Sequence, residues 1–444
     1  MSVNRRGLLL LGVTIAAAGL LYGALSGYAR ATNDRGGTDF NVFYLAGRTV
    51  LDGHASELFS VYTARGPGYT YIYLPMFAIL MAPLSSLPIH LTSIVWSLLS
   101  LLMIGHSALI LYRGCVSGSP RGTSLKRPYL IYLVAASVVF FAENLLLGQV
   151  HILLMYLMVL AWKYQRANAE WAAGCLIGAA AVLKLLPAVF GLYFLLTRQY
   201  RALASMVITG VLLVSVVPGL AIGFETNGTL VKEFYEIQIE PFVSGETTDA
   251  GIYARTAKQK TLNDQDLGAL LMRHFTADHY FVAEMEAEAY RFLNVSSLNT
   301  SNVRRFMFVG FGVFLLATIA IFFHRRVLIE SDPDGKDLFF ALFVLLSLLL
   351  SPRIRLAYLT VLMIPYGLLI RNVLIQHDKH TAFLSSKILA LSVGSLLLFS
   401  LPLFRAMTVL YYGLAFLFVG ILRLLATRDV HGLKLANGSS VISR

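Results

Sequence analysis

Residues 129–163 read YLIYLVAASVVFFAENLLLGQVHILLMYLMVLAWK, two apolar runs joined by the short turn Gly148-Gln149. Crossing the hydrocarbon core of a bilayer takes about 20 apolar residues, or fewer where partner helices bury the segment. Similar runs fill most of the 444 residues, of which 57% are apolar and 14% are charged. Because soluble domains carry roughly 25% charged residues, this composition excludes an ordinary soluble fold. The sequence therefore predicts an all-α polytopic membrane protein.

About twelve segments are candidates for membrane-spanning helices. They cover residues 7–28, 90–112, 129–147, 150–163, 172–185, 187–197, 202–223, 303–323, 338–351, 355–371, 387–402 and 405–426. The apolar stretch 71–87 is bounded by prolines, so we expect a juxtamembrane or re-entrant segment there. Three parts follow: a transmembrane module 1–223 with the first outer loop 29–89, a loop subdomain 224–302 with a helical stretch at 264–275, and a C-terminal transmembrane module 303–444.

Lys and Arg residues orient these spans. If 71–87 does not cross, the basic clusters between spans, including those at 113–127, 163–166 and 423–434, all fall on one side. The positive-inside rule makes that side the cytoplasm, so both termini are expected there. The loops 29–89 and 224–302 then lie outside and hold two thirds of the acidic residues. Topology explains the formal charge of +12 better than nucleic acid, which is not an expected partner.

The outer segments carry a series of polar motifs. Thr38-Asp39-Phe40-Asn41 opens an amphipathic helix that is predicted to end at Gly53. Along the chain follow Tyr71-Ile72-Tyr73-Leu74-Pro75, then Leu147-Gly148-Gln149-Val150-His151, and then Gly174 to Gly178 leading to Leu183-Lys184-Leu185-Leu186-Pro187. An isolated Asp at a helix start is as readily an N-cap as a functional residue. A functional interpretation of Asp39 therefore depends on its companions.

Together these motifs resemble glycosyltransferase family 87, which includes mycobacterial polyprenyl-phosphomannose-dependent mannosyltransferases and has the GT-C fold. The likeness is specific over about residues 35–205. It implies transfer of a hexose, with mannose favoured, from a polyprenyl monophosphate carrier to a glycolipid, with inversion at the anomeric carbon. It also implies that the reaction takes place at the extracytoplasmic face of a bacterial plasma membrane, with membrane lipids as further partners.

The resemblance also implies an acidic base in the first outer loop. Asp39 matches that position, and Asp34 is the nearby competitor. An inverting transfer needs a base on the acceptor hydroxyl, which contributes roughly 10² to 10⁴ in rate. The leaving group is a phosphate, so cations or N–H groups are needed in place of a strong acid.

Candidate ligands of that phosphate are cations expected at the outer surface. They are Lys184, Lys260 in a cluster with Arg255 and Lys258, Arg273, and Arg353 with Arg355. Further candidate donor contacts are Gln149, Asn263 and Gln265, and candidates for an acceptor or lipid groove are Tyr44, Tyr71, Tyr73 and His151. Each has a structural alternative, because Lys can snorkel to headgroups, Arg pairs bind headgroups, and aromatic residues anchor helices at the interface.

Where related sequences often place aromatic and His residues after Ser351-Pro352, this chain has Arg353, Arg355 and Tyr358. That departure indicates either an arginine that serves the donor phosphate or a different acceptor.

No cofactor and no metal are expected. The triplets Asp264-Gln265-Asp266 and Asp332-Pro333-Asp334 have the Asp-x-Asp spacing, but a lipid monophosphate offers no diphosphate for a metal to chelate. We interpret the first triplet as surface helix capping and the second as a cytoplasmic turn. The main alternative function is a lipid-linked sugar flippase or transporter, followed by a non-catalytic assembly protein. Transporters place ionisable groups near the bilayer midplane, whereas these spans carry almost none apart from Glu143 and Lys184 near their outer ends.

Overall fold

Apolar helices account for nearly all of the structure. A computed structural model describes residues 5–33, 38–61, 71–120, 122–240, 264–275, 293–375 and 378–428, and within these ranges the chain forms helices and no β-strand. Eight of the described helices are long and apolar enough to cross a membrane: Leu9–Ala31, Ile89–Cys115, Gly122–Leu147, Tyr200–Ile222, Ser301–Ser331, Leu356–Ile375, Lys379–Phe399 and Val409–Thr427. The all-α membrane fold is confirmed, whereas the count of about twelve spans is not.

The helices follow the predicted apolar segments closely. Their bounds are α1 (Arg5–Ala31), α2 (Asp39–Leu51), η1 (Ala55–Ser60), α3 (Pro75–Ser85), α4 (Ile89–Cys115), α5 (Gly122–Leu147), α6 (His151–Arg166), α7 (Glu170–Leu183), η2 (Leu186–Val189), α8 (Phe190–Leu196), α9 (Tyr200–Val211), η3 (Leu212–Val216), α10 (Val217–Ile222), α11 (Phe224–Phe234), η4 (Tyr235–Ile239), α14 (Leu267–Phe275), α16 (Thr300–Ser331), α17 (Pro333–Leu349), η6 (Leu356–Leu362), α18 (Met363–Ile375), α19 (Lys379–Phe399), α20 (Pro402–Ala406) and α21 (Val409–Thr427). The predicted helical stretch at 264–275 is α14.

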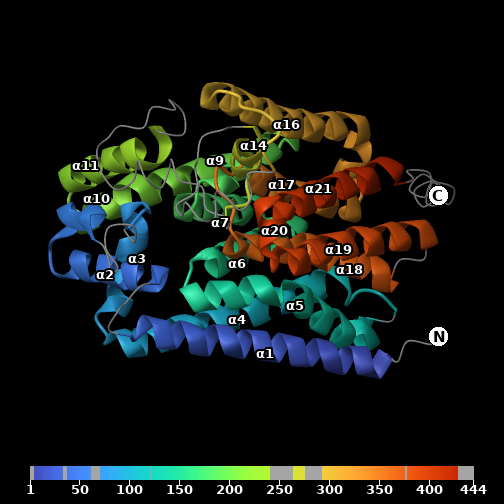
Figure 1. Cartoon of the computed structure of the whole chain (residues 1–444), viewed down its shortest axis with the longest axis horizontal. Helices are drawn as coiled ribbons and strands as arrows, with labels where there is room; N and C mark the ends of the chain where they lie inside the picture. The colour runs from blue at the N-terminus through green and yellow to red at the C-terminus, as the bar shows by residue number, and fades with distance from the viewer. Residues whose placement is uncertain are drawn as a thin grey trace, which may run out of the picture.

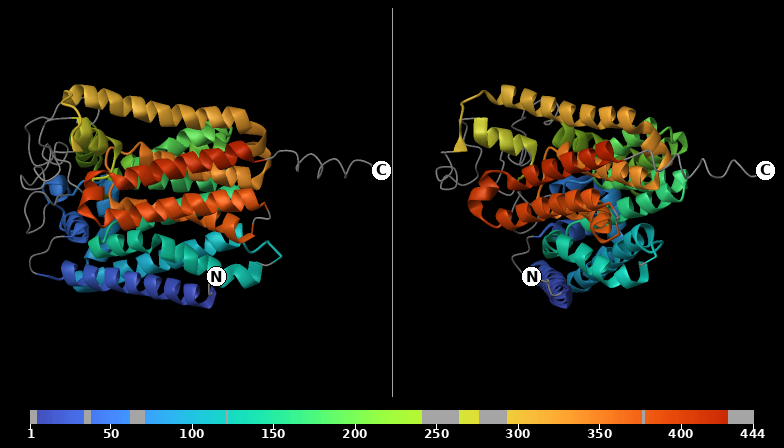
Figure 2. Two further views of the ribbon diagram at one scale, coloured as in Figure 1. Left: turned by 45° about the vertical axis from the view of Figure 1, so that its right-hand side comes forward. Right: turned by 90° about the vertical axis from the view of Figure 1, so that its right-hand side faces the viewer.

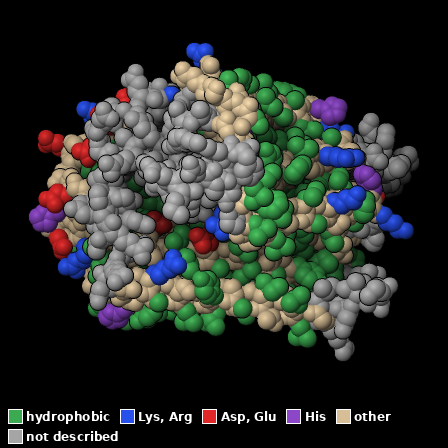
Figure 3. Space-filling view, viewed as in Figure 1, with side chains coloured by type: hydrophobic (Ala, Val, Ile, Leu, Met, Phe, Trp, Pro, Cys, Tyr) green, Lys and Arg blue, Asp and Glu red, His purple; other side chains and the backbone are tan. Residues whose placement is uncertain are grey.

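The long helices run side by side along one axis (Figure 1). The start of α1 and the end of α21 lie at one end of this bundle, which we call the termini end, and α2, α3 and α11 lie at the other, the loop end. Both views in Figure 2 place α1 and α16 on opposite edges. In Figure 3 hydrophobic side chains gather on the visible face toward the termini end, and most of the acidic side chains seen there lie toward the loop end.

The central helix α17 explains why some apolar segments are too short to span by themselves. Its residues 338–349 are all buried, and Phe339, Phe340 and Phe343 pack around Tyr193. A helix that is enclosed by protein on all sides does not need a full lipid-facing length. Of its flanking helices, α6 and α8 are similarly short.

The Gly174-to-Gly178 motif is a helix-packing device. A Cβ at Gly178 would lie 2.6 Å from the carbonyl oxygen of Met206, and a Cβ at Gly174 would collide with that of Ala202. Two small residues four positions apart let α7 and α9 approach closely, as is typical of packed membrane helices. The motif thereby fixes α7, which ends one residue before Lys184.

A separate apolar cluster at the loop end holds α2 in place. The Phe43 ring packs edge-on against Tyr73 and Phe77, with ring centroids 5.3 and 4.9 Å apart. At the start of α2, the Asn41 amide donates to the carbonyl of Ala31 at 2.9 Å, which ties α2 to the end of α1. The predicted helix after Thr38 is confirmed, and Gly53 follows it with a φ of +79°.

Candidate active site

A cavity of about 370 Å³ opens at the loop end. Its walls come from α2, the turn before α6, the break between α7 and η2, the π-helical η4, and the segment after α17. The residues that line it are Asp39, Val42, Phe43, Ile72, Tyr73, Leu74, Gln149, Val182, Leu183, Lys184, Leu185, Leu186, Phe234, Gln238, Ile239, Ser351, Pro352, Arg353, Arg355 and Tyr358. Candidates taken from five distant sequence motifs therefore meet in one place.

Asp39 is the first residue of α2, but it does not cap the helix. The cap is Thr38, whose side chain and that of Asn41 form a reciprocal capping box. The Asp39 carboxylate instead accepts a hydrogen bond from the Gln149 amide. Because the backbone and Thr38 already satisfy the helix start, the N-cap alternative does not explain why an acid stands at this position.

Gly148 places Gln149 beside that carboxylate. Its φ is +64°, a conformation that favours glycine. A Cβ at this position would also overlap the Cβ of Phe40, the neighbour of Asp39 in α2. The turn between α5 and α6 can therefore approach α2 closely only when it carries a glycine.

Burial controls the ionisation of Asp39. Removal from water raises the pKa of its carboxyl above the ordinary value, and the Gln149 hydrogen bond and the positive charges of Arg355 and Lys184 offset this in part. A carboxylate with a raised pKa holds a proton more firmly once it has accepted one. That property suits a general base.

The Lys184 ammonium contacts two aromatic rings, those of His151 and Tyr358. Lys184 ends α7 in an extended conformation, φ −156° and ψ 127°, just before Pro187. Its ammonium lies 2.6 Å from Nε2 of His151 and 3.2 Å from the ring centroid of Tyr358. His151 itself is 1% exposed and stacks on Tyr358 at 4.2 Å between centroids. His151, predicted for the acceptor or lipid groove, does not line the cavity; it lies behind Lys184, where its Nε2 accepts the ammonium hydrogen bond.

Arg353 and Arg355 converge on one buried carboxylate. Arg353 donates to both oxygens of Asp264, at 2.7 and 3.1 Å, and Arg355 Nε donates to Oδ1 at 3.0 Å. The Asp264 side chain is fully buried, while those of Arg353 and Arg355 are 28% and 40% exposed. Charge-assisted hydrogen bonds with Asp264 raise the pKa of Arg353 above its ordinary value, although burial acts in the other direction. Both arginines are thus fixed at the cavity wall with part of each guanidinium exposed.

The interpretation of 264–266 as surface helix capping is wrong about the surface, because all three residues are buried, and correct about capping only for Asp266. Asp266 caps α14 by accepting from the backbone N–H of Ala269 at 2.9 Å. Asp264, in contrast, is the buried partner of the two arginines, and the adjacent Gln265 N–H donates to the carbonyl of Ile354 at 2.7 Å. The loop thus packs against the segment after α17.

The side chains of Gln265 and Arg273 do not line the cavity. The Gln265 amide donates to the carbonyl of Arg405 at 2.9 Å, and Arg273 donates to Oγ1 of Thr408 at 2.9 Å and to the Asp264 carbonyl at 2.8 Å. These contacts dock α14 against α20 and α21.

The tyrosines and the outer-loop candidates are distributed differently. Tyr73 lines the cavity, whereas Tyr44 and Tyr71 do not: their hydroxyls donate to the carbonyls of Leu87 and Leu74, at 3.0 and 2.8 Å. Asp34, Lys260 and Asn263 lie outside the described residues.

Residues 71–352, more than half of the chain, match glycosyltransferase family 87. The chain belongs to this family. The resemblance that its motifs indicated is therefore confirmed.

Two mycobacterial members of family 87 show what the chain is similar to. The polyprenol-phosphate-mannose-dependent alpha-(1-2)-phosphatidylinositol mannoside mannosyltransferase of Mycobacterium tuberculosis is 30% identical over 177 residues, which cover 37% of this chain and 40% of that protein. The protein of the same name from Mycolicibacterium smegmatis is 32% identical over 185 residues, 39% of this chain and 41% of that protein. The chain thus matches about two fifths of the length of these curated relatives. Among solved structures, ArnT from Cupriavidus metallidurans in the apo state gives a TM-score of 0.40 at 13% identity, covering 95% of this chain and 76% of that chain.

Several cavity residues of this family 87 member carried no signal in the sequence. Phe234, Gln238 and Ile239 come from α11 and η4, which belong to the predicted loop subdomain and contain no motif. Two arginines two positions apart in an extended segment point the same way and indicate a shared carboxylate, but the sequence does not identify that carboxylate as Asp264. Apart from its cations, amides and Asp39, the cavity wall is largely apolar.

Proposed function

We propose that this chain is an inverting glycosyltransferase that moves a hexose, with mannose favoured, from a polyprenyl monophosphate to a hydroxyl of a glycolipid. Membership of family 87 and the names of the relatives support this reaction class. The observation that carries the proposal is the single cavity in which the Asp39 carboxylate shares a wall with Lys184, Arg353 and Arg355. A base for the acceptor hydroxyl and cations for a departing phosphate are the groups that the reaction requires.

In the proposed reaction, Asp39 accepts the proton of the acceptor hydroxyl. The acceptor oxygen forms a bond to the anomeric carbon from the face opposite the phosphate. The bond from that carbon to the phosphate oxygen breaks, and its electron pair leaves with the polyprenyl phosphate. Lys184, Arg353 and Arg355 hold the negative charge of the leaving group, and Gln149 orients the Asp39 carboxylate. Asp264 acts as a positioning residue for the two arginines.

The apolar wall of the cavity suits the lipid tail of such a donor. Ile72 and Leu185 line the cavity and are 41% and 47% exposed. We place this loop end at the extracytoplasmic face of a bacterial plasma membrane and the termini end in the cytoplasm, as the distribution of Lys and Arg favours. Lipid-linked donor, glycolipid acceptor and membrane lipids are the proposed partners, and neither a metal nor a cofactor is part of the proposal.

The direct test measures sugar transfer by the purified chain in lipid nanodiscs. Polyprenyl-phosphate mannose is compared with the glucose and arabinose donors, each with a glycolipid acceptor. Asp39→Asn should lower the rate roughly 10²- to 10⁴-fold. Asp52→Asn is the matched control, since Asp52 lies at the end of the same helix, is 51% exposed and pairs only with Arg48. An unchanged rate in Asp39→Asn would refute the assignment, and translocation of the donor without product would favour the flippase.

A further inference from the structure

A second cavity, of about 210 Å³, lies far from the first. It is bounded by the last turn of α6, the turn between α6 and α7, and the start of α17. The start of α17 is fixed at the termini end, because Asp334 pairs with Arg428, which directly follows α21, at 2.6 Å. The two cavities therefore lie at opposite ends of the bundle.

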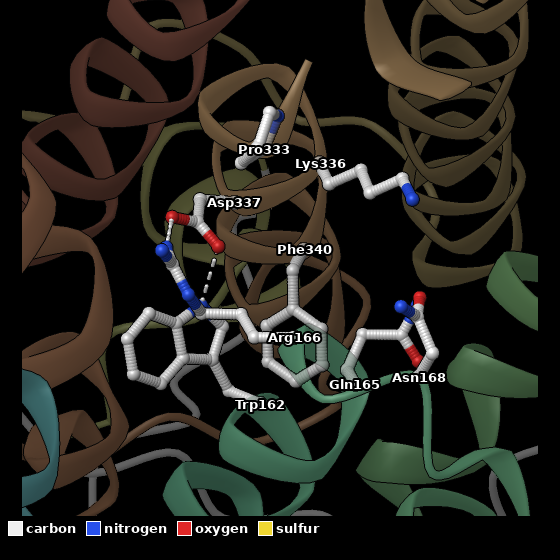
Figure 4. A pocket seen from close by; sticks show the side chains of 8 residues that line it. All are labelled: Trp162, Gln165, Arg166, Asn168, Pro333, Lys336, Asp337 and Phe340. Carbon is white, nitrogen blue, oxygen red and sulfur yellow. Dashed lines mark hydrogen bonds and ion pairs between the residues drawn. The ribbon is translucent and has the colours of Figure 1, made fainter. Parts of the chain in front are cut away.

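An aromatic floor and a fixed ion pair form the inner wall (Figure 4). The Trp162 indole N–H donates to Oδ1 of Asp337 at 2.9 Å, and Arg166 donates to its other oxygen. The Arg166 guanidinium also lies over the Trp162 ring, 5.2 Å from its centroid. Asp337 is 1% exposed, so its charge is neutralised by Arg166 inside the wall. These two hydrogen bonds use the indole nitrogen of Trp162 and one guanidinium nitrogen of Arg166, both of which face Asp337.

The open side of the cavity carries polar groups that the described part of the chain leaves unused. Lys336 extends past the Phe340 ring on the side where Gln165 and Asn168 also lie (Figure 4). Among the described residues, the Lys336 ammonium has no side-chain partner. Gln165 is 7% exposed; its amide N–H donates to the Tyr193 hydroxyl at 3.3 Å, but its Oε1 has no partner in these ranges. Buried acceptors in native structures are nearly always paired, so this amide indicates a missing hydroxyl donor.

The two other carboxylates at the start of α17, Asp332 and Asp334, pair with arginines. Asp334 pairs with Arg371 at 2.5 Å and with Arg428, and Asp332 pairs with Arg428 at 3.0 Å. Counting Arg166 and Asp337 as a neutral pair, the cavity keeps one positive charge from Lys336. Its ligand should therefore be an anion, and one that carries hydroxyl groups for the amides.

Exposed aromatic residues indicate the level of lipid headgroups at this end. Trp171, in the first turn of α7 and three residues after Asn168, is 53% exposed, and Tyr200, at the start of α9, is 61% exposed. Trp and Tyr are enriched at the membrane–water interface, and basic pockets between helices there bind anionic lipid headgroups. The cavity holds the volume of roughly seven water molecules, enough for a phosphate with a small polyol.

We propose that this cavity binds the headgroup of an anionic phospholipid of the phosphoglycerol type. The phosphate binds Lys336, and the headgroup hydroxyls bind the amides of Gln165 and Asn168, which lie on the same side of Phe340 (Figure 4). This site is independent of sugar transfer, because it shares no residue with the Asp39 cavity.

The test measures lipid binding to the full chain by native mass spectrometry in detergent. Phosphatidylglycerol, phosphatidic acid and phosphatidylcholine are titrated singly, together with glycerol phosphate and inorganic phosphate as soluble probes. Lys336→Gln should weaken phosphatidylglycerol binding by roughly tenfold more than Lys163→Gln does, because it removes a charge-assisted hydrogen bond. Lys163 is the matched control: it is exposed, lies on α6 near the same end and does not line the cavity.

The hydroxyl contacts have a separate readout. Gln165→Leu should abolish the preference for phosphatidylglycerol over phosphatidic acid, whose headgroup has no hydroxyl beyond the phosphate. Equal weakening by Lys336→Gln and Lys163→Gln would show diffuse surface attraction and overturn the site. Glycerol phosphate that binds as tightly as phosphatidylglycerol would overturn the lipid assignment in favour of a soluble phosphate ester. An unchanged headgroup preference in Gln165→Leu would overturn the role of the amide.

Discussion

Replacement of Asp264 by Asn tests whether the buried carboxylate positions the arginines of the cavity. The change keeps the shape of the side chain and removes the charge that accepts three hydrogen bonds, at 2.7, 3.0 and 3.1 Å, from Arg353 and Arg355. The amide that results must point one N–H group at a guanidinium. Both arginines should then leave their fixed positions at the cavity wall.

The expected loss of stability in Asp264→Asn depends on how deeply the two sides of the ion pair are buried. Leaving a buried charge without its partner costs about 3–5 kcal/mol. The arginine side chains are 28% and 40% exposed, so water screens part of this, and we expect about 2–3 kcal/mol. Each arginine side chain that must be ordered again when the donor binds costs about 0.5–1.5 kcal/mol of binding free energy. For two side chains, we expect the KM for the donor to rise about tenfold. Loss of the Asp264 charge also makes the cavity more positive, which favours binding of the phosphate. This effect is smaller, because an exposed charge contributes less than about 1 kcal/mol.

Asp266→Asn supplies the matched control. Asp266 lies two residues away in the same buried loop and caps α14, so its replacement should lower stability and leave the KM unchanged. Thermal unfolding in detergent and donor titrations of initial rate measure the two effects, and Asp264→Glu, which restores the charge, should recover much of the KM. Identical KM values for Asp264→Asn and Asp266→Asn would refute the positioning role, even if Asp264→Asn proved the less stable variant.

Three further predictions concern the base, the lysine and the helix that carries it. Burial raises the pKa of Asp39, so its carboxylate takes up a proton at a higher pH than an ordinary Asp does. When kcat/KM is measured across a buffer series, it should therefore rise with pH through a pKa above that of an ordinary Asp. A rise of kcat/KM at the ordinary Asp pKa would contradict this. His151→Phe keeps the stack on Tyr358 but removes the acceptor 2.6 Å from the Lys184 ammonium. We therefore expect a several-fold higher KM for the donor with little change in thermal stability. Comparable losses of donor affinity and of thermal stability would indicate a purely structural histidine. Gly178→Leu places side-chain atoms against the backbone of α9, which should cost about 1–3 kcal/mol in thermal unfolding and displace the end of α7; an unshifted unfolding midpoint would count against close packing there.

The local elements were predictable because each rests on a short-range signal. The helix after Thr38 has a capping box at its start and a glycine just after its end, and both are visible in the sequence. The meeting of Asp39 with Gln149 and Lys184 followed from the family resemblance, since hydrophobicity alone does not say which helix ends are neighbours.

Long-range pairing explains what the sequence did not reveal. Asp264 lies 89 residues before Arg353, and no periodic pattern links an acid in a loop to an arginine in a distant segment. The number of membrane spans was also hard to predict, because hydropathy does not separate residues buried by other helices from residues that face lipid. Leu342 in α17, for example, is buried by other helices.

The balance of charges around the first cavity bears on the class of donor. Lys184, Arg353 and Arg355 contribute three positive charges, and Asp39 and Asp264 contribute two negative charges, which leaves one positive charge when all five are ionised. A sugar linked to a lipid through one phosphate is a diester with a single negative charge, so it would leave the occupied cavity neutral. A sugar linked through a diphosphate brings a second negative charge that would require a further cation or a metal. Because unbalanced charge in a partly buried site is costly, a monophosphate carrier would match these five groups better than a diphosphate carrier when all of them are ionised.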